Sequence, residues 1–242
     1  MSKVAFITGG NRGLGLETAR GLGKLGITVV IGVRDIAKGD AAVQELKQQG
    51  INAEAIAFDS LNSSTFLDVR DYLERKYGKL DILVNNAGVA LGPLFGNNAS
   101  TASQDLLRKT FDVNFFSVIE LTQVLLPLIK KAPAGRIVNL ASILGSLGVH
   151  QMKDSPIAAA KELAYNASKT ALNAFTVHLA DELKDTAIKV NSAHPGWVKT
   201  DMGGAEAPME VSEGGKTSVQ LATLPADGPT GGFFHLGEAL PW

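Results

Sequence analysis

Short apolar runs alternate with longer segments of helical periodicity along this chain. The short runs are apolar at nearly every position, which is typical of parallel strands buried on both faces. We predict seven strands, at Val4–Thr8, Thr28–Val33, Ala53–Phe58, Ile82–Asn85, Arg136–Ala141, Lys189–Ala193 and Gly232–Phe234. The periodic segments predict helices over about 13–25, 37–49, 63–77, 103–130, 163–184 and 212–223, and the fourth is long enough to contain a break. This alternation predicts an α/β fold with a doubly wound, mostly parallel sheet flanked by helices.

The chain is expected to form one domain over residues 1–242, because no linker, repeat or low-complexity tract divides it. Three stretches between predicted elements are long enough to carry function, at 86–101, 143–162 and 195–211. Each follows a strand and should therefore lie at the carboxyl edge of the sheet, where open α/β sheets bind ligands.

Charge and composition narrow the classes of partner. Lys and Arg number 23 against 24 Asp and Glu, so no overall field attracts nucleic acid or an anionic membrane. The absence of cysteine and the wide spacing of the four histidines argue against a metal site. The N-terminus lacks the features of a signal peptide, and polar residues interrupt the most apolar helical stretch, Phe115 to Ile129. We therefore expect a cytoplasmic protein with no nucleic-acid or membrane partner.

A glycine-rich loop follows the first predicted strand and leads directly into a helix. Glycines allow a tight turn and a close backbone approach to a pyrophosphate, whose charge the helix N-terminus favours. This position within a βαβ unit predicts a Rossmann-type dinucleotide site rather than a turn with only a packing role. The loop residues that we assign to the site are Gly9, Asn11, Arg12, Gly13, Leu14 and Gly15.

The end of the second strand bears on the choice of coenzyme. An acid there would bind the ribose hydroxyls of NAD, whereas an arginine would pair with the 2′-phosphate of NADP. Arg34 and Asp35 are adjacent, so each coenzyme has a candidate. Arg12 offers a second cation, and two guanidinium groups favour the phosphate, so we predict NADP(H). After the third strand, Asp59, next to Ser60, could bind the adenine amine or cap the following helix.

Tyr165 and Lys169 lie four residues apart in a segment with helical periodicity, so their side chains share a face. A free phenol has a pKa near 10, and proton exchange near neutrality requires its anion to be favoured by roughly 3 units. A neighbouring ammonium and the positive ring of an oxidised nicotinamide can supply this preference. The same spacing also occurs in ordinary amphipathic helices, so the assignment depends on nearby residues.

Three further polar residues support a catalytic reading. Ser142 follows the fifth strand, where its hydroxyl could donate to a substrate carbonyl. Asn114 lies on an otherwise apolar helical stretch, and a water that links its amide to Lys169 would satisfy both groups. Asn86 follows the fourth strand at the same edge, within a segment that could equally be a simple Asn/Gly turn.

In combination these motifs resemble the short-chain dehydrogenase/reductase family over almost the whole chain. The motifs appear in the family's order, as Thr8-Gly-x-x-x-Gly-x-Gly15, Asn85-Asn-Ala-Gly88, Asn114, Ser142, Tyr165-x-x-x-Lys169 and Pro195-Gly196. The chain looks most similar to NADPH-dependent carbonyl reductases, through segments such as Val33-Arg34-Asp35 and His194-Pro-Gly-Trp-Val-Lys-Thr-Asp-Met-Gly-Gly204.

The resemblance implies roles for the matching residues. Tyr165 is the implied proton donor, Lys169 lowers its pKa and holds the nicotinamide ribose, Ser142 orients the carbonyl, and Asn114 anchors a relay water. Coenzyme contacts are implied at Asn86, Ala87 and Gly88 on the adenosine side, and at Pro195, Gly196, Val198 and Thr200 around the nicotinamide. We also assign Met202 to the coenzyme site, although it could belong to an apolar substrate pocket. The implied reaction is reversible reduction of ketones and aldehydes to alcohols.

The substrate and the assembly are less defined. Ile143, Leu144 and Trp197 suggest an apolar pocket for a hydrophobic carbonyl or alcohol, although each could belong to the core. An enone C=C reductase on the same fold is the main alternative, and a non-catalytic NADP(H) sensor is another. Relatives often associate through the helices that carry Asn114 and Tyr165. An insert at about 148–161 resembles the longer insert of monomeric carbonyl reductases, so a homo-oligomer and a monomer both stay open.

Overall fold

The computed structural model describes residues 2–92 and 99–242. Residues 93–98 of the predicted loop 86–101, and Met1 at the start of the first segment, lie outside the described residues.

One sheet passes through the described part of the chain, with the strand order β3-β2-β1-β4-β5-β6-β7-β8. The strands are β1 Val4–Thr8, β2 Thr28–Val33, β3 Ala53–Ala57, β4 Ile82–Asn85, β5 Arg136–Leu140, β6 Lys189–Ala193, β7 Phe233–His235 and β8 Glu238–Ala239. The first seven are parallel and β8 is antiparallel to β7. The order reverses between β1 and β4, and such a switch point opens a crevice at the carboxyl ends of the strands. The predicted doubly wound, single-domain α/β fold is confirmed.

The strand count differs from the prediction, because the sheet has eight strands rather than seven. The additional strand, β8, has only two residues and forms a tight hairpin with β7. The connecting Leu236 and Gly237 both have positive φ, at 47° and 90°. A two-residue turn of this kind is usually marked by Asn-Gly or Gly-Gly. The sequence did not predict this turn, because its first position is Leu236 and a leucine rarely adopts the left-handed conformation.

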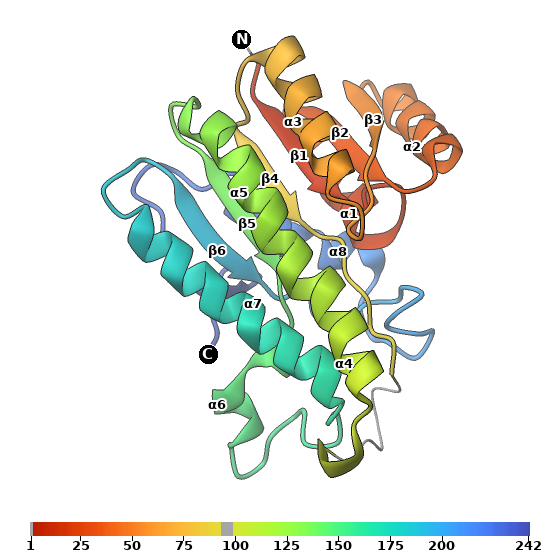
Figure 1. Ribbon diagram of the computed structural model, residues 1–242, viewed down its shortest axis with the longest axis vertical. Helices are drawn as coiled ribbons and strands as arrows, with labels where there is room; N and C mark the ends of the chain where they lie inside the picture. Colours follow the sequence, from red (N-terminus) through yellow and green to blue (C-terminus); the bar gives the residue numbers. More distant parts are fainter. Residues whose placement is uncertain (1, 93–98) are drawn as a thin grey trace.

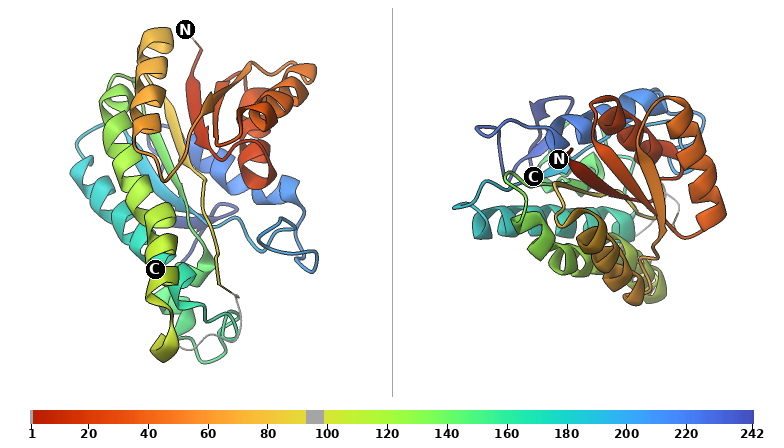
Figure 2. Two further views of the ribbon diagram at one scale, coloured as in Figure 1. Left: turned by 45° about the vertical axis from the view of Figure 1, so that its right-hand side comes forward. Right: turned by 90° about the horizontal axis from the view of Figure 1, so that it is seen from above.

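Helices cover both faces of the sheet (Figures 1 and 2). The helices are α1 Gly13–Lys24, α2 Ile36–Gln48, α3 Ser64–Tyr77, α4 Gln104–Phe111, α5 Ser117–Lys130, α6 Leu147–His150, α7 Leu163–Glu182, α8 Val211–Gly214 and α9 Lys216–Ala222. Side chains of α1, α2 and α9 pack in one apolar cluster, and those of α3, α5 and α7 in the other. The predicted helix 212–223 is therefore divided into α8 and α9, and the predicted loop 143–162 contains α6.

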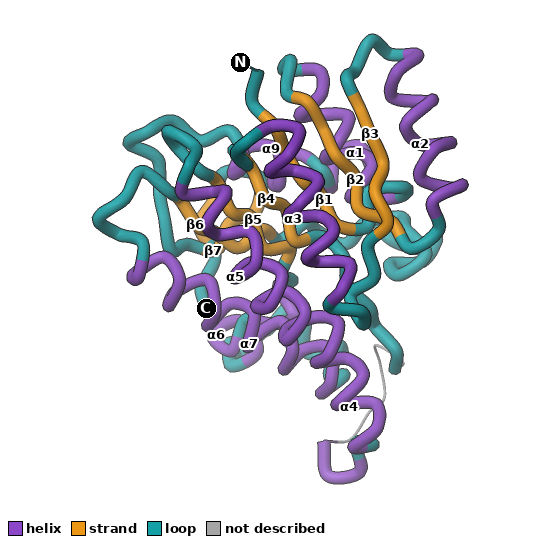
Figure 3. Tube along the Cα trace, turned by 45° about the horizontal axis from the view of Figure 1, so that its top comes forward, coloured by secondary structure: helices purple, strands orange, loops and turns teal. Residues whose placement is uncertain are grey.

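The strands β1 to β6 contribute to both apolar clusters because successive side chains alternate between the faces of a sheet. In β1, Ala5 and Ile7 belong to the cluster with α1 and α2, whereas Val4 and Phe6 belong to the other. The sheet lies between the two helical layers in Figure 3. This burial on both faces explains why the strands are apolar almost throughout.

The segment from Gln104 to Lys130 forms one long helical rod with a π-helical turn, Asp112–Phe116, between α4 and α5. By length and composition this rod would be able to span a membrane, a test that buried core helices also pass. Here Leu121, Leu125 and Ile129 are buried against the sheet and α3. The rod therefore serves as a core helix of the fold, and the π turn is the break within it.

Candidate active site

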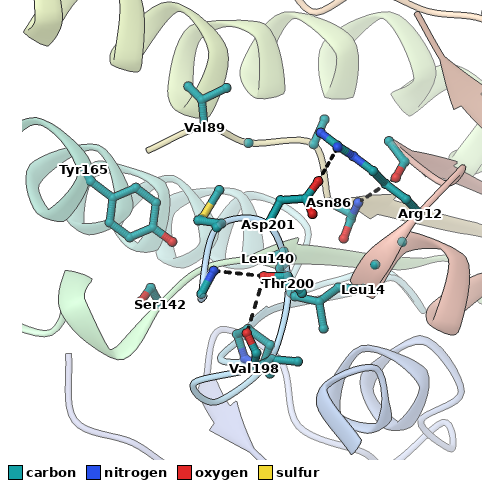
Figure 4. A pocket seen from close by; sticks show the side chains of 18 of the residues that line it. Arg12, Leu14, Asn86, Val89, Leu140, Ser142, Tyr165, Val198, Thr200 and Asp201 are labelled. Atoms are coloured by element: carbon teal, nitrogen blue, oxygen red, sulfur yellow. Dashed lines mark hydrogen bonds and ion pairs between the residues drawn. The ribbon is translucent and has the colours of Figure 1, made fainter. Parts of the chain in front are cut away.

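A cleft of about 820 Å³ lies at the carboxyl edge of the sheet, which is large enough for a dinucleotide and a small substrate. The side chains at its two ends are shown in Figure 4, with Tyr165 and Ser142 at one end and Arg12 at the other. The cleft is lined by these predicted site residues: Gly9, Asn11, Arg12, Gly13, Leu14, Gly15, Arg34, Asp59, Ser60, Asn86, Ala87, Gly88, Ser142, Ile143, Leu144, Tyr165, Lys169, Pro195, Gly196, Trp197, Val198, Thr200 and Met202. Asn114 lies behind the cleft wall.

The glycine loop has a backbone that only glycine accommodates easily. Gly9 and Gly13 have φ values of +66° and +53°, in the left-handed region. A Cβ on Gly15 would lie 2.4 Å from the Gly9 carbonyl oxygen, so the loop and α1 are in close backbone contact. The first N–H groups of a helix have no partner within it, and Arg12 at the N-cap makes no side-chain hydrogen bond to α1. This cradle fits the pyrophosphate of a dinucleotide.

Asn86 joins the end of β4 to this loop. Its amide nitrogen donates to the carbonyl oxygens of Thr8 at 2.7 Å and Gly9 at 3.3 Å, and its backbone N–H donates to the Thr8 hydroxyl at 2.9 Å. The Asn/Gly turn that the sequence left open therefore fixes the floor of the cleft between two neighbouring strands.

Arg34 and Asp35 differ in their local contacts. Asp35 is the N-cap of α2, where its carboxylate accepts from the Lys38 N–H at 3.3 Å and pairs with the Lys38 ammonium at 3.8 Å. Arg34 is exposed and has no ion-pair partner among the described residues. Lys38, in the first turn of α2, also lines the cleft and was not identified from the sequence. Arg34 and Lys38 thus give this end of the cleft positive charge.

Two other polar residues near this end also have partners. Arg12 pairs with Asp201 from the loop after β6, and both side chains are exposed. Asp59 accepts from the Leu61 N–H at 3.0 Å. Asp59 therefore caps a short turn before α3 rather than the helix itself, whose N-cap is Ser63.

Tyr165 and Lys169 lie on one face of α7, with the ammonium nitrogen 5.6 Å from the centroid of the phenol ring. Burial raises the pKa of Tyr165 to about 12, and a hydrogen bond with Ser142 opposes this shift. Burial also lowers the pKa of Lys169 to about 8, and its ammonium donates to the Leu140 carbonyl at 2.7 Å. Desolvation therefore favours the neutral form of both the phenol and the amine.

Asn114 is fully buried in the π turn between α4 and α5. Its amide oxygen accepts from the Val89 N–H at 2.8 Å, and its amide nitrogen donates to the Val89 carbonyl at 2.8 Å and the Ser168 hydroxyl at 3.0 Å. These bonds use both N–H groups and one lone pair of the amide oxygen. A relay water would therefore have to bind at the second lone pair of that oxygen. Asn114 joins three segments that surround Lys169.

The opposite end of the cleft is apolar and includes residues that the sequence analysis missed. The insert after α6 contributes Pro156, Ile157, Ala159 and Ala160 to the lining of the cleft, as do the predicted Leu144 and Trp197. The sequence provided little indication that the insert lines the cleft, because the insert has no regular periodicity and its first half is polar. The insert therefore forms part of the cleft wall.

His194 is a further lining residue that was quoted only as part of a motif. Its Nδ1 accepts from the N–H groups of Ile143 at 3.3 Å and Gly196 at 3.4 Å. Burial, together with the nearby His235, lowers the pKa of His194 to about 3. A neutral imidazole therefore joins the segment after Ser142 to the loop after β6.

Fold and cleft together define a dinucleotide-dependent oxidoreductase, and comparisons with known proteins agree. Residues 3–210 match the family described as short chain dehydrogenase. Human carbonyl reductase (NADPH) 1 is 34% identical over 282 aligned positions, which cover 99% of this chain and 98% of the human protein. The structure of the carbonyl reductase Sniffer of D. melanogaster covers 100% of both chains with 30% identity and a TM-score of 0.82.

A third similar protein is the NADPH-bound carbonyl reductase from chicken fatty liver. Its structure has a TM-score of 0.83 at 25% identity, and the match covers 100% of this chain and 99% of the chicken chain. The chain belongs to the short-chain dehydrogenase family. It is an NADP-dependent oxidoreductase, similar to carbonyl reductases, and NADP(H) is its coenzyme.

Proposed function

We propose that the protein reduces hydrophobic ketones and aldehydes with NADPH, and that Tyr165 is the general acid. The observation that carries the proposal is the buried group at one end of the cleft, where Tyr165, Ser142 and Lys169 meet. The reverse reaction, alcohol oxidation, uses the same groups with Tyr165 as base.

NADPH supplies the hydride that is added to the carbonyl carbon. Tyr165 donates its hydroxyl proton to the carbonyl oxygen, so hydride and proton together convert C=O to CH–OH. Its pKa of about 12 keeps the phenol protonated near neutrality, the state that a donor requires. Ser142 donates a hydrogen bond to the oxygen as negative charge develops there. The Lys169 ammonium favours the phenolate that remains until a proton returns from solvent.

The coenzyme is oriented by the two ends of the cleft. We place the 2′-phosphate at Arg34, Lys38 and Arg12, the pyrophosphate at the glycine loop, and the adenine near Asp59. Gly88, Pro195, Thr200 and Tyr165 would hold the nicotinamide. The apolar wall from the insert and Trp197 favours a substrate without charge.

Replacement of Tyr165 by phenylalanine tests the proposal. We expect kcat for carbonyl reduction to fall by about 10² or more, since general acid catalysis contributes roughly 10²–10⁴, with NADPH affinity nearly unchanged. Tyr72→Phe is the matched control, because that phenol binds Glu54 outside the cleft. Tyr165→Phe with wild-type activity would show that the acid is assigned wrongly. Ketone and enone substrates are compared in the same assay, and NADPH consumption with enones alone would identify a C=C reductase.

A further inference from the structure

Glu162 is a buried carboxylate directly before α7, the helix that carries Tyr165 and Lys169. Its side chain is only 2% exposed. One carboxylate oxygen accepts from the Ala164 N–H at 3.1 Å, and the other accepts from the N–H of Tyr165 at 2.5 Å. Glu162 is therefore the N-cap of the catalytic helix, with both oxygens in use.

This cap differs from an ordinary one. Helices are usually capped by the short side chains of Ser, Thr, Asp or Asn, and a buried charge is costly unless hydrogen bonds and opposite charge compensate. Among the described residues, Glu162 forms no ion pair. Its charge is compensated by two backbone N–H groups and by the positive end of the helix dipole. The N–H groups of the first turn of α7 thus stabilise the carboxylate, and the carboxylate fixes that first turn.

The same turn contains Tyr165, the third residue of the helix. Helix ends fray, so a side chain in the first turn is positioned only as well as that turn is fixed. The Tyr165 backbone is held on both sides, because Glu162 accepts from its N–H and the Ser168 hydroxyl donates to its carbonyl at 2.7 Å. Ser168 also accepts from the Asn114 amide at 3.0 Å. These bonds connect Glu162 to the Asn114 network through the backbone of Tyr165.

We propose that Glu162 is a positioning residue for Tyr165, whose phenol it holds against Ser142 by capping the first turn of α7. The inference rests on the proposed role of Tyr165 as the general acid. A misplacement of about 1 Å in a catalytic group costs up to 10²-fold in rate, so even a frayed first turn should reduce turnover.

The test compares Glu162→Ala with Glu162→Asp. We expect Glu162→Ala to lower kcat about tenfold with the NADPH Kd within about twofold, because the glycine loop lies on other elements. Aspartate is a preferred N-cap, so Glu162→Asp should return kcat to within about threefold of wild type. Ser103→Ala is the control, since it removes the cap of α4 away from the cleft. Equal kcat in Glu162→Ala and Ser103→Ala would overturn the proposal, as would failure of aspartate to restore the rate.

Hydrogen exchange gives a readout that does not depend on turnover. The amides of Ala164 and Tyr165 should exchange about tenfold faster in Glu162→Ala than in wild type. If that variant does not fold, Glu162→Gln, which has the same size and one acceptor oxygen, should show faster exchange at one of the two amides. Unchanged exchange at both would overturn the proposal. Absence of carbonyl reduction in the wild-type protein would instead contradict the proposed function, while the exchange result still tests the cap.

Discussion

At the scale of single residues, burial sets the charge states in the cleft. Tyr165 and Lys169 are one helical turn apart, and desolvation favours the neutral form of each. It raises the pKa of Tyr165 to about 12 and lowers that of Lys169 to about 8. The spacing of the pair was visible in the sequence, but the direction of the tyrosine shift depends on burial by residues far away in the chain.

The Lys169 pKa gives a prediction for pH dependence. Below about pH 8 the ammonium is protonated and favours the phenolate that forms, so kcat/KM for carbonyl reduction should be level there. As pH rises through about 8, the ammonium loses its proton and kcat/KM should fall, while Tyr165 stays protonated. Initial rates between pH 6 and pH 10 measure this profile. A profile that stays flat to pH 10 would exclude an essential Lys169 charge.

Arg34 gives a prediction for coenzyme preference. A hydrogen bond to a charged group contributes roughly 1.5–3 kcal/mol, so Arg34→Ala should raise the NADPH KM about 10- to 100-fold. The NADH KM should change little, because NADH has no 2′-phosphate. Arg75→Ala, which removes an exposed cation on α3, is the control. Equal changes for both coenzymes would remove Arg34 from the phosphate site.

At the scale of elements, the hydrophobic periodicity predicted the main helices and strands, because these elements depend on residues that are close together in the chain. It did not give the π turn that contains Asn114, since Asp112-Val-Asn-Phe-Phe116 is as apolar as an ordinary helix. π turns are frequent at functional sites, and here the buried amide binds the backbone of Val89 across the cleft wall. That partner is 25 residues away in the chain, so local sequence carries no signal for it.

The contact between the glycine loop and α1 can be tested with Gly15→Ala. The added Cβ would lie 2.4 Å from the Gly9 carbonyl oxygen, so the phosphate loop must shift. We expect the NADPH Kd to rise at least about tenfold, as for the loss of one good hydrogen bond to a charged group. Gly21→Ala is the matched control in the same helix, because its Cβ would meet the Val219 side chain, away from the cleft, instead of the phosphate-loop backbone. Similar NADPH affinity in the two variants would argue against this cradle.

At the scale of the whole molecule, the cleft is assembled from segments that follow six parallel strands, β1 to β6. Residues from Gly9 to Met202 meet there because the strand order reverses between β1 and β4. The loops after β1 and β6 are also joined by the Arg12–Asp201 pair. Coenzyme bound in this cleft contacts both halves of the sheet and should therefore stabilise the entire fold.

Thermal unfolding with and without coenzyme checks this expectation. A ligand at about 100 times its Kd adds roughly 2.7 kcal/mol to the free energy of unfolding. For a protein of this size, that corresponds to a rise in Tm of about 5–10 °C with NADPH. NADH at the same concentration should give a smaller rise. Equal rises for both coenzymes would contradict selective binding of the 2′-phosphate.

The sequence by itself determined the order of strands and helices, the glycine loop and the spacing of Tyr165 and Lys169. These features depend on residues within one or two turns of each other, so local pattern is enough. Only the tertiary structure decided that Asp35 caps α2 and leaves Arg34 exposed, that the insert lines the cleft, and that Glu162 caps α7. Burial and the choice of hydrogen-bond partner depend on which distant segments pack together, and that information is not contained in any short stretch of the chain.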